Sequence, residues 1–98
     1  MGSSLKNAHF LIENRMRDAA RGDADALYDL GMVYASGAQG AAINLIEAHK
    51  WFNLAAMSGS VAAQACRAEI AGDMSASEIA AAQRAARAWI QSGQPRAH

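Results

Sequence analysis

The sequence predicts an all-α protein of about five helices, and three observations support this fold class. About a quarter of the residues are Ala, the strongest helix former, and the single Pro is at position 95. Apolar residues recur three and four positions apart between capping residues, whereas no segment alternates like a strand. At 98 residues with 52% hydrophobic content, residues 1–98 can bury one modest core, so we expect a single domain.

The first predicted helix covers residues 5–21 and ends before Gly22, a residue type that commonly stops helices. Its apolar stripe at helical spacing consists of Leu5, Ala8, Ile12, Met16 and Ala19. Phe10 and Leu11 lie off this stripe. Two bulky apolar residues at these positions predict either a second covering surface or an exposed patch.

The second predicted helix covers residues 24–36, with Asp23 as its N-cap and Gly37 after its end. One face carries Leu27, Leu30, Gly31 and Tyr34, and the opposite face carries Asp25, Asp29, Met32 and Ser36. A glycine costs about 1 kcal/mol in a helix interior. Gly31 therefore predicts close approach of a neighbouring helix.

Residues 37–44 form a predicted loop, after which Asn44 and Glu47 have the spacing of a capping box. The third helix extends from there to Gly59. Its broad stripe, which we expect to be buried, consists of Leu45, Ala48, Trp51, Phe52, Ala55 and Ala56.

Ser60 is the predicted cap of a fourth helix over residues 61–71, and Ser75 with Glu78 forms a second capping box. The fifth helix then covers residues 76–92 and ends before Gly93 and Pro95. Its buried stripe is predicted to contain Ile79, Ala82, Ala86, Trp89 and Ile90, with Arg84, Arg87 and Gln91 on the opposite side.

The chain contains the start of an internal repeat. Gly22 and Gly59 lie 37 residues apart, and each precedes a polar cap and small residues, so that Ala26 matches Ala63. The register then decays, since Leu30 would match Arg67. Residues 22–59 are one full unit, and residues 60–92 are a partial unit followed by a C-terminal capping helix.

The segment "GDADALYDLGMVYASG", followed after a loop by "EAHKWFNLAAMSG", resembles a Sel-one-like repeat, a relative of the tetratricopeptide-like helical solenoids. The matching positions are Gly22, Asp23, Ala24, Ala26, Leu30, Gly31, Tyr34, Gly37, Glu47, Ala48, Trp51, Phe52, Ala55, Ala56 and Gly59. The tail resembles the terminal helix that often follows such repeats in bacterial proteins.

The sequence departs from the family pattern at Leu27, where a polar residue is usual, and in the loop "AQGAAIN". Asn14 and Arg15 stand where the first helix would carry aromatics. The resemblance implies a short α–α superhelix, with the first and fifth helices as caps, and an adaptor role in protein complexes.

Composition argues against several other function classes. Nine Lys and Arg balance nine Asp and Glu, which gives no overall field toward nucleic acid or an anionic membrane. No apolar run reaches the roughly 18 residues of a membrane span. The lone Cys66 fits a reducing compartment, so we expect a cytoplasmic protein. Arg84 and Arg87, with Arg96, form a small basic face that leaves a DNA-binding regulator as a minor alternative.

No catalytic, cofactor or metal site is predicted. His9, His49 and His98 do not cluster with Cys at metal-ligand spacing, and we expect exposed or half-buried imidazoles. Cys66 lies among alanines, an environment that keeps a thiol protonated. The acids Asp25 and Asp29, one turn apart, are more typical of a solvated face than of a catalytic pair.

An interaction module remains. Tetratricopeptide-like units use the outer face of each first helix, which here consists of Asp25, Tyr28, Asp29, Met32 and Ser36. Such a face suits a peptide or a partner helix of unknown identity. We expect Ala at Tyr28 and Met32 to abolish partner capture without lowering the melting temperature. The alternatives are a homodimer through Phe10 and Leu11, or a fragment of a longer solenoid.

Overall fold

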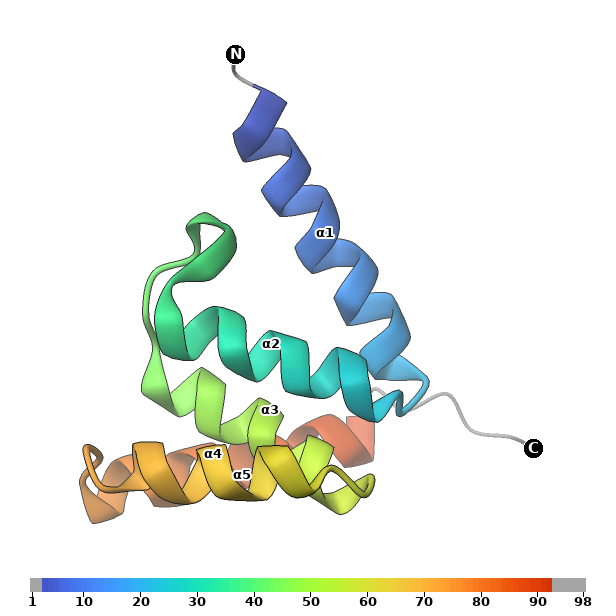
Figure 1. The fold of residues 1–98 in the computed structure, drawn as a ribbon. Coiled ribbons are helices and arrows are strands. Elements are labelled where there is room, and N and C mark those ends of the chain that lie inside the picture. The colour runs from blue at the N-terminus through green and yellow to red at the C-terminus, as the bar shows by residue number, and fades with distance from the viewer. Residues whose placement is uncertain (1–2, 93–98) are drawn as a thin grey trace.

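The computed structural model describes residues 3–92, with side chains from residue 11 onward. Its elements are α1 (Ser3–Ala20), α2 (Ala24–Ser36), a 3-10 turn η1 (Ala38–Gly40), α3 (Leu45–Met57), α4 (Val61–Ala71) and α5 (Ala76–Ser92) (Figure 1). The described residues contain no strand, and the predicted all-α class with about five helices is confirmed.

The predicted bounds of the second and fourth helices and the predicted start of the fifth agree with the structure, while the first helix begins and ends slightly earlier than predicted. The turn η1 was not predicted. It lies within the predicted loop, where Gln39 adopts the left-handed conformation with φ 59° and ψ 21°. The predicted end of α5 at Gly93 and Pro95 lies outside the described residues.

Helices α1 to α4 pack mainly against their neighbours in the chain, whereas α5 packs against α3. In Figure 1, α2 and α3 run side by side in opposite directions, and α4 and α5 both pack against α3. Helix α1 contacts α2 and η1, and its N-terminal half projects away from the other helices. No helix in the described part is long and apolar enough to cross a membrane.

The close approach predicted at Gly31 is present, and Phe52 makes it. A Cβ built on Gly31 would lie 2.9 Å from Phe52 Cγ and closer still to two other ring carbons. Such distances are not tolerated by packed atoms. The missing side chain at Gly31 is therefore what lets α3 lie against α2.

The centre of the core is formed by Trp51, Phe52 and Leu30, the largest fully buried side chains. Trp89 of α5 packs edge-on against Trp51, with ring centroids 4.8 Å apart and planes at 76°. Most predicted repeat positions are internal. Ala26, Leu30, Ala48, Trp51, Phe52 and Ala55 are buried, whereas Tyr34 and Ala56 are half-buried against the core. The turn residues Gly22 and Gly59 are exposed. Leu54, which was not predicted, is buried because α3 has neighbours on three sides.

Three of the predicted caps form as expected. Asp23 accepts hydrogen bonds from the backbone of Asp25 and Ala26, and Ser60 accepts one from the Ala63 backbone at 3.1 Å. At the start of α5, Ser75 and Glu78 each accept a hydrogen bond from the other's backbone N–H. This is the reciprocal pattern of a capping box.

The capping box predicted at Asn44 and Glu47 is only half formed. The Asn44 side chain accepts from the Glu47 backbone at 3.1 Å. The Glu47 carboxylate does not bond the Asn44 backbone. It accepts from Trp51 Nε1 at 2.9 Å and pairs with Lys50, while the Asn44 backbone N–H donates to the Tyr34 carbonyl.

The two predicted repeat starts share one local geometry. Gly22 and Gly59 both have positive φ, 82° and 104°, a conformation that favours glycine, and Gly37 has φ 76° at the end of α2. Each of the first two glycines precedes a side-chain cap, and then a buried Ala, Ala26 at 2% exposure and Ala63 at 0%. The same turn thus opens α2 and α4.

Candidate functional site

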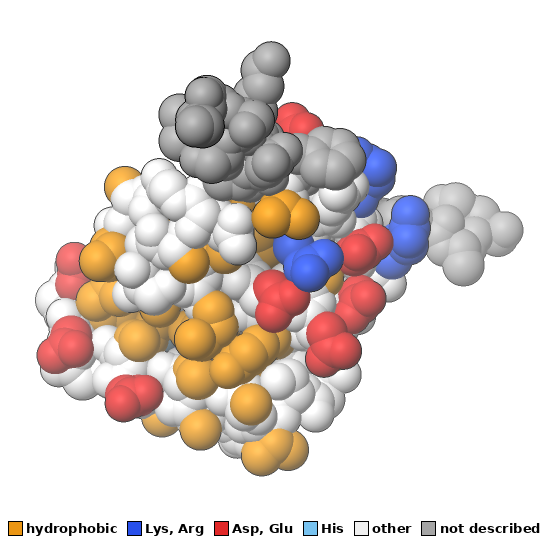
Figure 2. Space-filling view, turned by 45° about the horizontal axis from the view of Figure 1, so that its top comes forward, with side chains coloured by type: hydrophobic (Ala, Val, Ile, Leu, Met, Phe, Trp, Pro, Cys, Tyr) orange, Lys and Arg blue, Asp and Glu red, His pale blue; other side chains and the backbone are white. Residues whose placement is uncertain are grey.

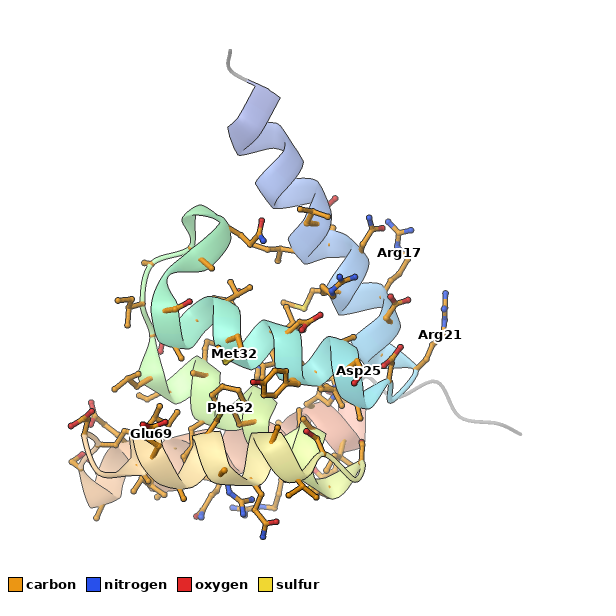
Figure 3. All side chains as sticks on the ribbon, viewed as in Figure 1. Arg17, Arg21, Asp25, Met32, Phe52 and Glu69 are labelled. Atoms are coloured by element: carbon orange, nitrogen blue, oxygen red, sulfur yellow. The ribbon has the colours of Figure 1, made fainter. Side chains whose placement is uncertain are left out.

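The predicted partner-binding residues all lie on α2, but their side chains have different surroundings. Asp25 is exposed in the first turn, and Met32 is 39% exposed near the middle of the helix. Figure 3 shows both on the outer side of α2. These two exposed side chains make no side-chain hydrogen bond or ion pair with the rest of the described chain.

Asp29 and Ser36 already have partners within the chain. The Arg15 guanidinium of α1 donates to Asp29 Oδ2 at 2.9 Å, which ties α1 to α2. The Ser36 hydroxyl donates to the Met32 carbonyl at 2.7 Å and accepts from the Ala38 backbone. Ser36 is the last residue of α2, before the C-cap Gly37, and a partner would have to compete with its two hydrogen bonds.

Tyr28 packs partly against the core, which argues against the expectation that it can be replaced without loss of stability. Its ring centroid lies 5.8 Å from that of Phe52, and its hydroxyl lies 4.0 Å from Cys66 Sγ on α4. The hydrogen bond with Cys66 raises the pKa of Tyr28. Truncation of this ring would expose the core beneath α2 and α4.

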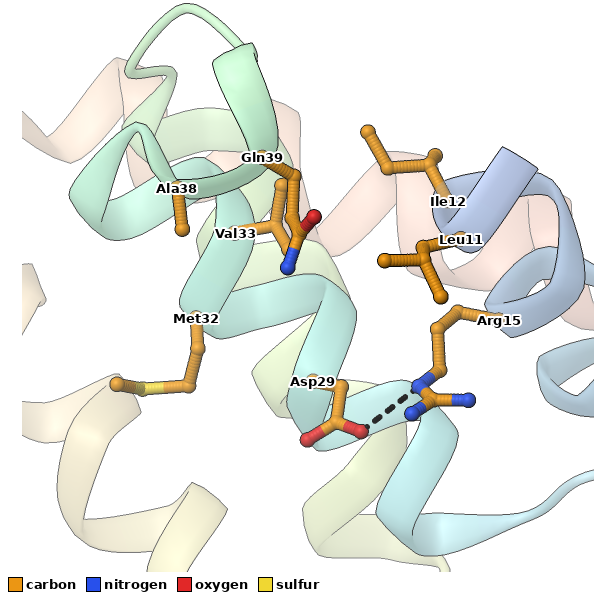
Figure 4. Close-up of a pocket in the computed structure, with 8 residues that line it drawn as sticks. All are labelled: Leu11, Ile12, Arg15, Asp29, Met32, Val33, Ala38 and Gln39. Carbon is orange, nitrogen blue, oxygen red and sulfur yellow. Dashed lines mark hydrogen bonds and ion pairs between the residues drawn. The ribbon is translucent and has the colours of Figure 1, made fainter. Parts of the chain in front are cut away.

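A groove of about 300 Å3 lies between α1 and α2 (Figure 4). We call it the α1–α2 groove; its lining residues are Leu11, Ile12, Arg15, Asp29, Met32, Val33, Ala38 and Gln39. Leu11 is 42% exposed and, in Figure 4, points across the groove toward α2. The second self-association candidate, Phe10, has a side chain outside the described residues.

The α1–α2 groove brings together two residues that were predicted from the sequence to have separate roles. Leu11 was a candidate for self-association and Met32 for partner binding, yet both line the same groove. The angle between the two helices decides this, and helical spacing within each helix carries no information about it. Gln39 was also missed; its left-handed backbone places its amide in the groove.

On its other side, α2 adjoins α4 through the contact between Tyr28 and Cys66. On α4, Ala62 and Glu69 lie at helical spacing from Cys66, and Ala65 lies at helical spacing from both of them; all three are exposed. We call Asp25, Tyr28, Met32, Ala62, Ala65, Cys66 and Glu69 together the α2–α4 face. Figure 2 shows apolar side chains gathered in the middle of this side of the molecule, with acidic side chains at both flanks.

The remaining sequence candidates stay apart from this surface. His49 is 4% exposed, which corrects the expectation of an exposed or half-buried imidazole, and His9 and His98 lie outside the described side chains. Arg84 and Arg87 are exposed on α5, and Arg96 lies outside the described residues. Within the described part, no three His, Cys, Asp or Glu side chains are grouped as metal ligands.

Burial of His49 affects its protonation. Its Nδ1 is buried without a hydrogen-bond partner, and beside it Arg67 of α4 donates to Asn53. Burial, reinforced by the positive charge of Arg67, lowers the pKa of His49. The imidazole is therefore held neutral between α3 and α4.

Comparison of the chain with protein families, with curated proteins and with solved structures found no match.

Proposed function

We propose that the chain is a non-catalytic interaction module of the Sel-one-like type, which binds a peptide or partner helix along the outer side of α2. The observation that carries the proposal is Met32. It is a long, flexible apolar side chain, 39% exposed, at the place where the α1–α2 groove meets the α2–α4 face. A methionine side chain adapts to varied partners, and its burial in an interface is energetically favourable.

Two observations support the repeat assignment. The turns at Gly22 and Gly59 have the same conformation and lead into the same cap-and-alanine pattern. Phe52 packs on the bare backbone of Gly31, which accounts for two of the positions that resemble the family. In tetratricopeptide-like proteins the helix that corresponds to α2 contributes its outer face to binding, which is a fold-level analogy.

A matched pair of methionine variants tests the proposal. Met32→Ala is compared with Met57→Ala, because Met57 is 65% exposed at the end of α3, away from the proposed surface. Proteins captured by the immobilised wild-type chain are identified by mass spectrometry, and the binding of the main one is measured by calorimetry. We expect Met32→Ala to weaken binding by roughly tenfold, the effect of losing about 1–2 kcal/mol of interface contact. Equal affinities for the two variants would refute the proposed surface.

Self-association is a second candidate function, favoured by the 42% exposure of Leu11. An exposed apolar side chain in a groove suits a second copy of the chain as well as a foreign partner. Sedimentation velocity over a hundredfold concentration range separates the two. A constant monomer mass excludes the dimer, whereas a mass that rises in the wild type and not in Leu11→Ser supports it.

A further inference from the structure

The charges around the proposed surface are unevenly distributed. Asp25, in the first turn of α2, and Glu69, in the last turn of α4, stand at opposite edges of the α2–α4 face, and both are exposed (Figure 3). Asp73, just beyond the end of α4, is also exposed. These three carboxylates have no ion-pair partner among the described residues.

Most basic side chains of the described residues are engaged or lie elsewhere. Lys50 pairs with Glu47, and Arg67 donates to Asn53 on α3. Arg84 and Arg87 are on α5. Arg15 borders the proposed surface, and its charge is balanced by Asp29. Arg17 and Arg21, at the end of α1, are exposed on the same side of the molecule as Asp25 (Figure 3), and Arg21 pairs with Asp18.

Between the acidic edges the surface is apolar, and on α4 its side chains are short. Met32 and the Tyr28 ring stand on α2, whereas Ala62 and Ala65 on α4 offer no side chain beyond Cβ. Small residues let the backbone of another helix come close. A partner that fits must therefore supply an apolar strip for the middle and positive charge for both edges.

We infer that the partner of this module is an amphipathic helix whose apolar stripe is flanked by Lys or Arg, held on the α2–α4 face. The inference rests on the proposed function and names the chemistry of its partner. Complementary charge steers such a helix and sets its orientation, while burial of the apolar strip supplies most of the affinity.

A second copy of the chain fits this surface less well. The exposed arginines of α5 offer the required charge, but the apolar stripe of α5 is turned into the core, with Ala82 and Ala86 buried and Trp89 packed on Trp51. The outer side of α5 therefore has positive charge without an apolar strip. A separate helix supplies both.

Two synthetic peptides of ~18 residues, about five helical turns, test the inference. Both carry the same stripe of Leu and Ala; the flanking positions are Lys in one peptide and Glu in the other. Binding of each labelled peptide to the full chain is followed by fluorescence anisotropy at low and at physiological salt. We expect the Lys peptide to bind at least roughly tenfold more tightly at low salt, with an advantage that shrinks as salt screens the charges.

Matched variants locate the effect. Glu69→Gln removes one negative charge from the α2–α4 face, and Glu13→Gln removes one from the exposed side of α1. We expect Glu69→Gln to weaken the Lys peptide by roughly two- to fivefold, the effect of one exposed ion pair, and Glu13→Gln to leave it unchanged. Thermal melts confirm that both variants are folded.

Each other outcome counts against a stated part of the inference. Equal affinity for the two peptides, a preference for the Glu peptide, or equal effects of the two variants would overturn the charge complementarity and leave the proposed function standing. Absence of binding by either peptide, or binding that Met32→Ala leaves unchanged, would overturn both. A chain that self-associates and excludes the peptides would show that a second copy occupies the surface.

Discussion

The Phe52 ring of α3 lies directly on the backbone of Gly31 in α2, in the space that any side chain at position 31 would fill. Phe52 is 1% exposed, and its ring also packs against the half-buried ring of Tyr28. One contact between a glycine and an aromatic ring thus sets the distance between α2 and α3 and supports the surface proposed for binding.

Gly31→Ala is expected to destabilise the protein, although alanine is the better helix former. The added methyl group forces the ring or the helix to move, at a cost of about 1–3 kcal/mol. That corresponds to a fall in melting temperature of roughly 4–8 °C for each kcal/mol. Gly72→Ala is the control, because Gly72 has helical φ and its added Cβ would meet only the Glu69 carbonyl oxygen at 3.4 Å. A stability of Gly31→Ala equal to or above that of the control would contradict this packing.

Tyr28 and Met32 are expected to separate stability from binding. Tyr28→Ala removes a ring that packs on Phe52 and should lower the unfolding free energy by about 2–4 kcal/mol. Met32→Ala, at an exposed position, should change it by no more than about 0.5 kcal/mol. Urea titrations followed by circular dichroism measure both. Similar losses in the two variants would show that Met32 is part of the core.

Glu47 is expected to stabilise the core edge through its hydrogen bond with the Trp51 indole. Glu47→Ala leaves the buried indole N–H without an acceptor and Lys50 without its carboxylate, at a cost of about 1–3 kcal/mol. Glu47→Gln keeps an oxygen for Trp51 and should lose less. Chemical denaturation followed by tryptophan fluorescence compares the two, and equal losses would show that the charge matters and the indole bond does not.

Stability is expected to fall in mild acid because of His49. Its pKa is lower in the folded state than in the unfolded chain, where an ordinary value of about 6.5 applies. The unfolded state therefore binds a proton first as pH falls. The contribution of neutral His49 is fully present above the unfolded pKa and is lost as pH drops from about 6.5 toward the lowered folded pKa.

His49→Leu is the matching variant. It removes the titrating group and the unpartnered Nδ1, and it places an apolar side chain at this buried position. His9 and His98 are present in both proteins and serve as an internal control. Unfolding free energies measured between pH 5 and 8 should depend less on pH in the variant. Parallel curves for the two proteins would exclude His49 as the source.

The helices and their caps were predictable from sequence because they depend on near neighbours in the chain. Gly22, Asp23 and Ser60 act within one turn, and the stripe with Trp51 and Phe52 follows from helical period alone. Gly31 was also informative, because a glycine in mid-helix has few explanations besides close packing.

The proposed surface was predictable only in part, since it depends on how helices cross. Period placed Asp29, Met32 and Ser36 on the outer side of α2. It carries no information on the Arg15 ion pair, the hydrogen bond from Ser36 to the Met32 carbonyl or the contact between Tyr28 and Cys66. The same limit applies to Glu47, whose carboxylate was predicted to accept from the Asn44 backbone and instead accepts from the indole of Trp51.

The order of packing also shapes how the chain reaches its native state. Most interhelical contacts join elements that are consecutive in sequence, α1 with α2, α2 with α3, and α3 with α4. Closing short loops costs little entropy, and topologies dominated by local contacts fold within microseconds to milliseconds. The α2–α3 hairpin, which encloses Phe52, can therefore assemble early without waiting for distant segments of the chain to meet.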